Sequence, residues 1–351
     1  MKFLYVLENI RNPVFDFFFS LITHIGEETV FLVVAILFFW CINKREGYYI
    51  LITGLVGTLV NQFLKLVCKV RRPWVKNPSF TIVESAKEQA TGYSFPSGHT
   101  QNVAGTFGAI GAYSSKKWIR ISAVVIIVLV SFSRMYLGVH TPWDVLASLG
   151  IAAVLVFGLY PLFKNEERFN KVMPYIVAVS FVLSFAFIMY VLYAPGYTFS
   201  DVNYKSAMKN AYTLFGCTLG LVAVYTFDRL YINFDTKAPW YAQVIKLTLG
   251  LGAVIGIKVG LSAPLTALFG NEYTARAARY ALIVIFAGIL WPLTFKLFAK
   301  MRIRCLDAFA VKVRCIFDKE LRADIEARKE IETKRVKLEN RKKKQNKNKK
   351  R

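Results

Sequence analysis

The sequence of 351 residues contains only three histidines, and two of them lie in polar segments that interrupt long apolar ones. In the segment Ser133–Asp144, His140 is followed four positions later by Asp144. Residues four apart share one face of a helix or of its lead-in turn, so the carboxylate can bond one imidazole nitrogen. Such a bond fixes the tautomer and leaves a lone pair on the other nitrogen. The pair is therefore typical of a histidine nucleophile.

A second polar segment, Phe95–Thr100, opens another apolar stretch with the sequence Phe-Pro-Ser-Gly-His-Thr. Ser97 is a natural helix N-cap, and Gly98 allows a ligand to approach the backbone closely. The exposed N–H groups at such a helix start favour an anion. His99 follows directly and titrates near physiological pH, so it is a candidate general acid and base.

A third cluster closes the apolar stretch before Pro73. Lys65 and Arg72 are seven positions apart, about two helical turns, and therefore face the same way. Two cations on one face without a nearby acid favour an anion, since Arg presents a planar fork of donors to phosphate and Lys acts as a point charge. Arg134, six residues before His140, adds a third cation. The three clusters together predict a site for phosphate chemistry.

The composition identifies the elements that must hold these residues. Hydrophobic residues make up 55% of the chain and charged residues 19%, against roughly 45–50% and about 25% in soluble proteins. Runs such as Phe31–Ile42 carry no charge. Five cysteines exclude a disulfide scaffold, and 29 Phe with 18 Tyr exclude disorder over most of the chain. The sequence predicts an all-α polytopic membrane helical bundle.

Nine stretches approach the length of about 20 apolar residues that crosses a bilayer. They are approximately 29–42, 47–67, 99–115, 118–134, 142–163, 173–193, 207–227, 241–263 and 279–298. The three polar clusters fall at one end of spans two to five. We therefore expect four parts, namely an interfacial amphipathic helix over 1–28, a catalytic core over 29–165, additional transmembrane helices over 166–298 and a basic tail over 299–351.

The net charge of +24 is concentrated at the C-terminus, because residues 296–351 hold 21 of the 46 Lys and Arg but 8 of the 22 Asp and Glu. Basic residues beside spans tend to stay in the cytoplasm. We therefore expect a cytoplasmic tail, an extracytoplasmic site and a plasma-membrane location. The tail either fixes topology as a solvated segment, contacts an anionic lipid surface, or binds RNA or protein. No aromatic residue follows Phe317 to stack on bases, so no nucleic-acid partner is expected.

Taken in order, Lys-x6-Arg-Pro, Pro-Ser-Gly-His and Ser-Arg-x5-His-x3-Asp resemble the signature of the type 2 phosphatidic acid phosphatase superfamily. This superfamily includes membrane lipid phosphatases, isoprenyl diphosphate phosphatases and glucose-6-phosphatases. The resemblance covers roughly residues 10–165 and implies a six-helix-type phosphatase core, to which the later spans form an extension. Nine spans with a cytoplasmic C-terminus are similar to the glucose-6-phosphatase layout.

The resemblance implies that His140 attacks phosphorus to form a phosphohistidine while Asp144 orients its ring. His99 would protonate the leaving oxygen and then activate water. The substrate-binding residues would be Lys65, Arg72, Ser97, Gly98 and Arg134. Because these cations and donors can neutralise the phosphoryl oxygens, neither a metal nor another cofactor is expected.

Three functions remain open from the sequence. The first is hydrolysis of a lipid phosphate or an isoprenyl diphosphate, with a water-soluble phosphate ester as a variant. The second is a lipid phosphotransferase that passes the same phosphoryl group to an alcohol. The third is a phosphate-binding transporter, which leaves the His140–Asp144 pair and His99 unexplained.

Overall fold

The computed structural model describes residues 1–87, 90–193 and 202–303, together with 305–307, 309, 310, 313, 323, 326, 327, 331 and 335. Every regular element in these residues is helical, which confirms the all-α fold. Most of the expected basic tail over 299–351 lies outside the described residues. The chain divides into two compact units, one of residues 1–238 with 242–299 and one of residues 239–241 with 300–351.

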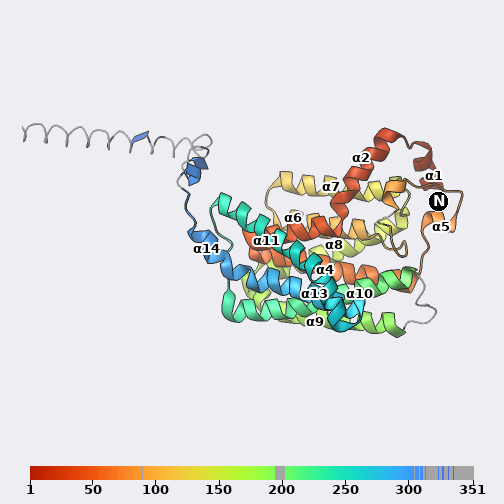
Figure 1. Cartoon of the computed structure of the whole chain (residues 1–351). Helices are drawn as coiled ribbons and strands as arrows, with labels where there is room; N and C mark the ends of the chain where they lie inside the picture. The colour runs from red at the N-terminus through yellow and green to blue at the C-terminus, as the bar shows by residue number, and fades with distance from the viewer. Residues whose placement is uncertain are drawn as a thin grey trace, which may run out of the picture. The chain divides into compact units, whose positions relative to one another are not determined.

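Figure 1 shows the order of the helices along the chain. Their bounds are α1 (Lys2–Asn9), α2 (Pro13–Thr23), η1 (His24–Gly26), α3 (Glu28–Leu37), η2 (Phe38–Ile42), α4 (Lys44–Cys68), α5 (Pro73–Lys76), η3 (Glu84–Ala86), α6 (Gly98–Tyr113), α7 (Lys117–Tyr136), α8 (Pro142–Lys164), α9 (Glu166–Tyr193), α10 (Val202–Phe227), η4 (Asp228–Ile232), α11 (Trp240–Gly260), α12 (Ser262–Phe269), α13 (Glu272–Ile285), η5 (Phe286–Leu290), η6 (Pro292–Thr294) and α14 (Phe295–Lys300).

Seven helical segments of the described chain are long and apolar enough to cross a membrane. An eighth is possible if Pro13–Gly26 and Glu28–Ile42, which meet at a bend of 50°, form one span. The remaining expected span, 99–115, corresponds to α6, which has 16 residues. At 1.5 Å per residue α6 is about 24 Å long, short of the roughly 30 Å hydrocarbon core. The protein is thus a multi-pass membrane protein, and the count of nine spans is not confirmed.

Helix α4 sets the long dimension of the core. Asn43 caps its start by accepting hydrogen bonds from the N–H groups of Arg45 and Glu46. The helix ends where Lys69 adopts a left-handed conformation with φ of 47°. Its 25 residues span about 37 Å, so Lys44 and Lys65 lie near opposite ends of the bundle.

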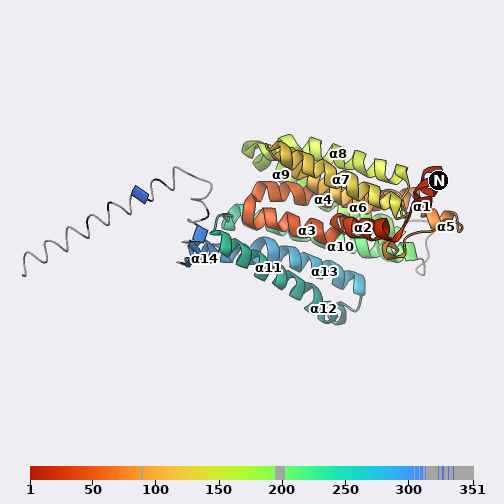
Figure 2. The same ribbon diagram turned by 90° about the horizontal axis from the view of Figure 1, so that it is seen from above.

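Helix α6 packs among α4, α7 and α8, as Figure 2 shows from above. Gly57 lies at the contact of α6 with α4, where an added Cβ would come within 2.5 Å of Nε2 of Gln101 and the Gln101 side chain would have to shift. Helices α9 and α10 lie beside this core, where Phe187 and Ala211 join one buried cluster with Leu59 and Leu66. The end of α4, the start of α6, the end of α7 and the start of α8 therefore meet at one end of the bundle.

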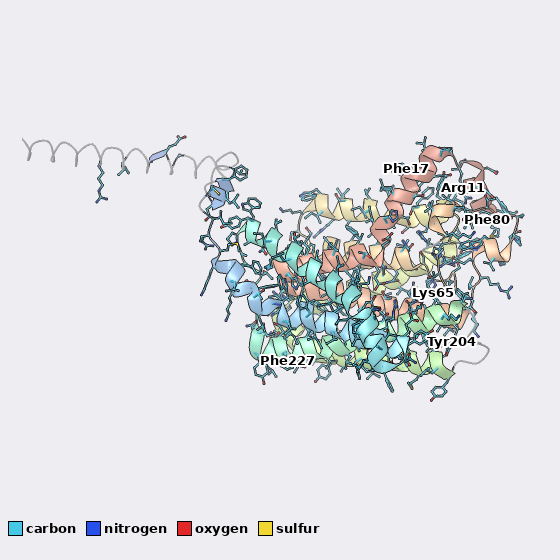
Figure 3. All side chains as sticks on the ribbon, in the orientation of Figure 1. Arg11, Phe17, Lys65, Phe80, Tyr204 and Phe227 are labelled. Carbon is cyan, nitrogen blue, oxygen red and sulfur yellow. The ribbon has the colours of Figure 1, made fainter. Side chains whose placement is uncertain are left out.

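The N-terminal 28 residues form two helices, α1 and α2, followed by a turn, where one amphipathic helix was expected. They pack against the same end of the bundle. Leu4 and Leu7 share a buried cluster with Phe80, and Nε of Arg11 donates to the Tyr136 carbonyl at 3.0 Å. Figure 3 labels Arg11 and Phe80 at this end. Attachment of this segment to a membrane surface stays a prediction.

Candidate active site

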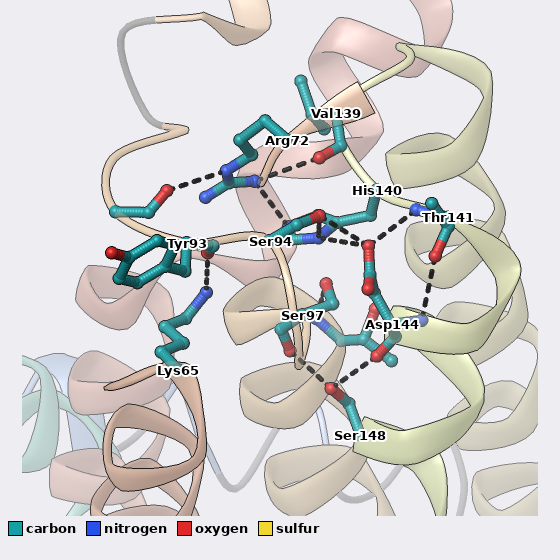
Figure 4. A network of polar contacts seen from close by, with 12 residues as sticks. Lys65, Arg72, Tyr93, Ser94, Ser97, Val139, His140, Thr141, Asp144 and Ser148 are labelled. Carbon is teal, nitrogen blue, oxygen red and sulfur yellow. Dashed lines mark hydrogen bonds and ion pairs between the residues drawn. The ribbon is translucent and has the colours of Figure 1, made fainter. Parts of the chain in front are cut away.

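The imidazole of His140 lies between the carboxylate of Asp144 and the guanidinium of Arg72. Its Nδ1 is 3.5 Å from Oδ2 of Asp144, and its Nε2 is 3.0 Å from Nη1 of Arg72 (Figure 4). A carboxylate only accepts and a guanidinium only donates. We therefore assign the proton to Nδ1, which leaves the Nε2 lone pair on the side of Arg72. The distance to Asp144 is longer than a normal hydrogen bond, so this pair is looser than the sequence suggested.

The carboxylate of Asp144 is held mainly by groups other than His140. Its Oδ2 accepts hydrogen bonds from Oγ of Ser94 at 2.6 Å and from N–H of Thr141 at 2.7 Å. The Asp144 N–H donates in turn to Oγ1 of Thr141 at 3.3 Å, which completes a capping box at the start of α8. Sequence reasoning missed both partners. The Thr-Pro-Trp-Asp pattern could have indicated Thr141, whereas nothing in the sequence pointed to Ser94.

Lys65 and Arg72 are buried and donate to backbone carbonyls of the loops before α6 and α8. The Lys65 ammonium donates to the Tyr93 carbonyl at 2.7 Å. Arg72 donates to the carbonyls of Thr91, Gly92 and Val139 at 2.8, 3.1 and 3.0 Å. These partners are neutral, so both cations keep their net charge available to an anion.

Arg134 is fully buried near the end of α7. Its Nη1 donates to Oγ1 of Thr23 at 2.6 Å, a contact that the sequence did not indicate, while its Nε has no hydrogen-bond partner. A buried guanidinium donor without a partner is costly, and a phosphate oxygen is the acceptor that suits it. The Arg134 carbonyl also accepts from the N–H groups of Val139 and His140, both at 3.2 Å, and so ties the His140 loop to α7.

The start of α6 is fixed to the start of α8. Ser97 is the N-cap of α6, and its N–H donates to the Asp144 carbonyl at 3.1 Å. The Ser148 hydroxyl donates to the Ser97 carbonyl at 2.8 Å. An added Cβ at Gly98 would meet no atom within 4 Å, so the backbone there is accessible to a ligand. Burial, together with the charges of Arg134, His140, Arg72 and Lys65, holds the pKa of His99 well below its ordinary value, so the expectation that it titrates near physiological pH is wrong for the free site. A bound phosphate raises that pKa, because its negative charge favours the protonated ring.

The structure thus gathers all eight residues singled out in the sequence at one end of the bundle. Their surroundings favour an unprotonated imidazole at His140. Burial, together with the positive charges of Arg72, Arg134 and Lys65, holds the pKa of His140 well below its ordinary value. No group of three His, Cys, Asp or Glu side chains within the described residues could hold a metal ion. The cluster is therefore cationic and can receive an anion beside a ring with a lone pair.

Comparison with known proteins places this site in a family. Residues 45–168, which include all eight residues, match the PAP2 superfamily, and residues 212–302 match the PAP2 superfamily phosphatase transmembrane extension. Phosphatidylglycerophosphatase B of Bacillus subtilis is 30% identical over 176 residues, which are 46% of this chain and 82% of that protein. The chain belongs to the PAP2 superfamily.

Other PAP2 relatives carry names of lipid phosphatases. An undecaprenyl-diphosphatase of Sulfolobus acidocaldarius is 33% identical over 124 residues, or 35% of this chain and 58% of that relative. Lipid phosphate phosphatase delta of Arabidopsis thaliana is 24% identical over 288 residues, or 77% of this chain and 65% of the plant protein. The matched region thus covers somewhat over half the length of the archaeal relative. No solved structure matches this chain significantly.

Proposed function

We propose that this PAP2 protein is an integral membrane phosphatase that hydrolyses a phosphate monoester or diphosphate of a lipid through a phosphohistidine on His140, without a metal ion. The observation that carries the proposal is the His140 ring, with Nδ1 toward Asp144 and Nε2 toward Arg72. A ring held in this tautomer by an acceptor on one side presents its lone pair on the side where the guanidinium gathers anions.

In the first step, Nε2 of His140 forms a bond to phosphorus and the phosphorus–oxygen bond to the lipid breaks. His99 gives its proton to the departing oxygen, so the lipid leaves as an alcohol, or as a phosphate when the substrate is a diphosphate. The carboxylate of Asp144 stabilises the positive charge that develops on the ring. Lys65, Arg72 and Arg134 neutralise the equatorial oxygens together with Ser97 and the Gly98 backbone.

In the second step, water attacks the phosphohistidine and the phosphorus–nitrogen bond breaks. His99, now unprotonated, takes a proton from that water, which restores both histidines and releases inorganic phosphate. The electrons of the broken bond return to Nε2 as its lone pair. The three buried cations supply the charge that a divalent metal supplies in many phosphoryl-transfer sites.

A lipid substrate fits the position of the site. The catalytic residues lie at the ends of apolar helices, so a phosphate can reach them while its hydrocarbon chain stays in the bilayer. The named activities of the relatives concern undecaprenyl diphosphate, phosphatidylglycerophosphate and lipid phosphates. Because the basic tail is expected in the cytoplasm, we place the site on the extracytoplasmic side, within a catalytic core over residues 29–165.

The test is phosphate release by the purified full-length protein in detergent with excess EDTA. The substrates are undecaprenyl diphosphate, phosphatidylglycerophosphate, phosphatidate and glucose 6-phosphate. We expect EDTA-resistant release from at least one lipid, and a loss of about 10⁴-fold or more in His140→Ala, as for removal of other nucleophiles. Quenching with alkaline SDS, after reaction with a substrate ³²P-labelled on the transferred phosphoryl group, should trap an alkali-stable, acid-labile phosphoprotein in the wild type and none in His140→Ala.

Three other results would each contradict one part of the proposal. Release that disappears in EDTA and returns with Mg²⁺ contradicts metal-free catalysis. A trapped phosphoprotein that loses its label only when an alcohol is added, with the label recovered on the alcohol and not as inorganic phosphate, indicates a phosphotransferase. Binding of the substrates with neither release nor a trapped phosphoprotein indicates the transporter.

A further inference from the structure

A second polar cavity lies at the end of α4 opposite the catalytic residues. It has a volume of about 470 Å³ and is lined by the start of α4, the start of α9 and the turn η4 that ends α10. Lys44, in its wall, is 21 residues from Lys65, which corresponds to about 31 Å along the helix. Figure 3 labels Phe227, the residue before η4, toward the end of the bundle away from Arg11. The cavity is therefore separate from the active site.

One ion pair of this cavity is already satisfied. The Lys44 ammonium lies 2.7 Å from the carboxylate of Asp228, which is 5% exposed. The Tyr48 hydroxyl donates to the same carboxylate at 3.3 Å. Asp228 is thus neutralised within the wall and does not repel an anion strongly. The first N–H groups of α4 are equally engaged, because Asn43 caps them.

Two guanidinium groups in the wall have weaker partners. Arg45 lies 3.8 Å from the exposed carboxylate of Glu166 and donates to the Lys164 carbonyl at 3.5 Å. It also interacts with the Tyr113 hydroxyl. Arg229 donates to the Tyr225 hydroxyl at 3.4 Å. Contacts of this length are weak. Glu166 also lines this cavity, but its side chain is 78% exposed and its ion pair with Arg45 is long and therefore weak. Both guanidinium forks can therefore hold the oxygens of a phosphate group.

An apolar cavity of about 410 Å³ adjoins the polar one and shares Tyr225 and Arg229 with it. Its other walls come from α9, α10 and η4 and include Val177, Val222 and Leu230. Leu230 and the neighbouring Tyr231 are exposed on the surface, and an aromatic residue beside an aliphatic one at a helix end is typical of the bilayer interface. A cationic pocket that continues into an apolar one matches an amphiphile rather than a free ion.

We propose that these two cavities form a binding site for an anionic phospholipid of the leaflet opposite the catalytic site. Arg45 and Arg229 hold the phosphate of the headgroup, and one acyl chain occupies the apolar cavity between α9 and α10. Bound there, the lipid joins α4 of the catalytic core to the extension helices α9 and α10. This site does not depend on the phosphatase activity proposed above.

The test measures thermal unfolding of the full-length protein in dodecyl maltoside, titrated with phosphatidylglycerol, phosphatidylcholine or inorganic phosphate. We expect phosphatidylglycerol to raise the unfolding midpoint of the wild type. In the double variant Arg45→Gln/Arg229→Gln the apparent affinity should fall at least tenfold, because each hydrogen bond to a charged group contributes roughly a factor of ten or more. Phosphate release should stay within about twofold of the wild type.

Arg168→Gln is the matched control, since Arg168 is an exposed arginine of α9 that does not line either cavity. Arg72→Gln removes a cation of the candidate active site and so tests whether phosphatidylglycerol stabilises the protein by binding there instead. Both single variants should keep the phosphatidylglycerol response. Equal responses in the wild type and the double variant overturn the proposal, as does an equal loss in Arg168→Gln. A response to inorganic phosphate that matches phosphatidylglycerol and needs the two arginines overturns the lipid assignment in favour of a free anion.

Discussion

Basic side chains lie at both ends of α4, buried at Lys65 and partly exposed at Lys44, and their partners differ in charge. At the catalytic end, Lys65 donates to a backbone carbonyl, and Arg72 donates to three carbonyls and contacts the His140 ring. At the opposite end, Lys44 is paired with the carboxylate of Asp228. A carboxylate competes with phosphate for a cation far better than a carbonyl does. A buried cation is therefore available to a substrate where the protein surrounds it with dipoles rather than with a counter-charge.

This difference has an energetic consequence. At the end that holds the candidate site, Asp144 attracts Lys65 and Arg72, and Glu27 attracts Arg134, without a close ion pair. Burying cations with such partial compensation costs stability, and a bound anion offsets part of that cost. Lys44 and Asp228 instead stabilise each other and connect α4 with the turn η4. Substitutions at the catalytic end should therefore affect activity more than stability, and those at Asp228 the reverse.

The largest effect is expected for Arg72→Gln. Loss of the guanidinium removes charge stabilisation from the phosphoryl oxygens and should lower kcat/KM by about 10²–10³-fold. The thermal unfolding midpoint should change little, because removal of a costly buried charge offsets the loss of three hydrogen bonds to carbonyls. Steady-state phosphate release measures kcat/KM, and thermal unfolding in detergent measures the midpoint. Arg72→Lys should recover only part of the rate, since the planar fork is lost. A drop in kcat/KM below tenfold would contradict the assignment of Arg72.

At the opposite end, Asp228→Asn should lower the free energy of unfolding by about 2–4 kcal/mol, because it leaves the Lys44 charge unpaired in a largely buried position. The kcat/KM of the folded enzyme should stay within about twofold. Thermal unfolding measures the first quantity and phosphate release per folded protein the second. The double variant Lys44→Met/Asp228→Asn should regain most of the stability. A large loss of kcat/KM with unchanged stability would remove the contrast between the two ends.

A smaller effect is expected at Ser94, whose hydroxyl donates to Asp144 at 2.6 Å. Ser94→Ala removes one of the hydrogen bonds that position the Asp144 carboxylate, so this carboxylate orients the His140 ring less well. We expect kcat to fall about tenfold, the rough worth of one hydrogen bond to a charged group, with little change in KM. Ser85→Ala is the matched control, because Ser85 is exposed in the same loop and contacts Ser20. An equal loss in both variants would show that only the loop fold matters.

The smallest effect concerns pH. A protonated imidazole has no lone pair, so the rate should fall as pH drops through the pKa of His140. Since burial and the neighbouring cations hold that pKa low, the acid limb of kcat/KM should lie below about pH 6.5. Lys65→Gln removes one positive charge, raises the pKa of His140 and should move the limb to higher pH by less than about one unit. Lys44→Gln should leave the limb in place. A limb that moves to lower pH in Lys65→Gln refutes this electrostatic account.

Local patterns were sufficient for much of the fold and for the residues of the candidate site. Apolar runs of helical length indicated the spans, since a bilayer admits few other solutions. They did not settle α6, where a stretch rich in Gly and Ala forms a helix of 16 residues, so the span expected over 99–115 is not confirmed. The four-residue spacing placed Asp144 near His140, yet the spacing could not show that Ser94 and Thr141 hold the carboxylate more closely.

The sequence by itself determined which residues carry charge and a lone pair, and on which helix ends they lie, because both follow from residue type and helical period. Only the tertiary structure decided their partners. Thr23 reaches Arg134 from 111 positions away, and Lys44 reaches Asp228 from 184 positions away. Such contacts depend on how helices distant in the chain pack, which no local period encodes. As a result of that packing, Lys65 and Arg72 at one end of the bundle donate to backbone carbonyls, whereas Lys44 at the other end is paired with a carboxylate.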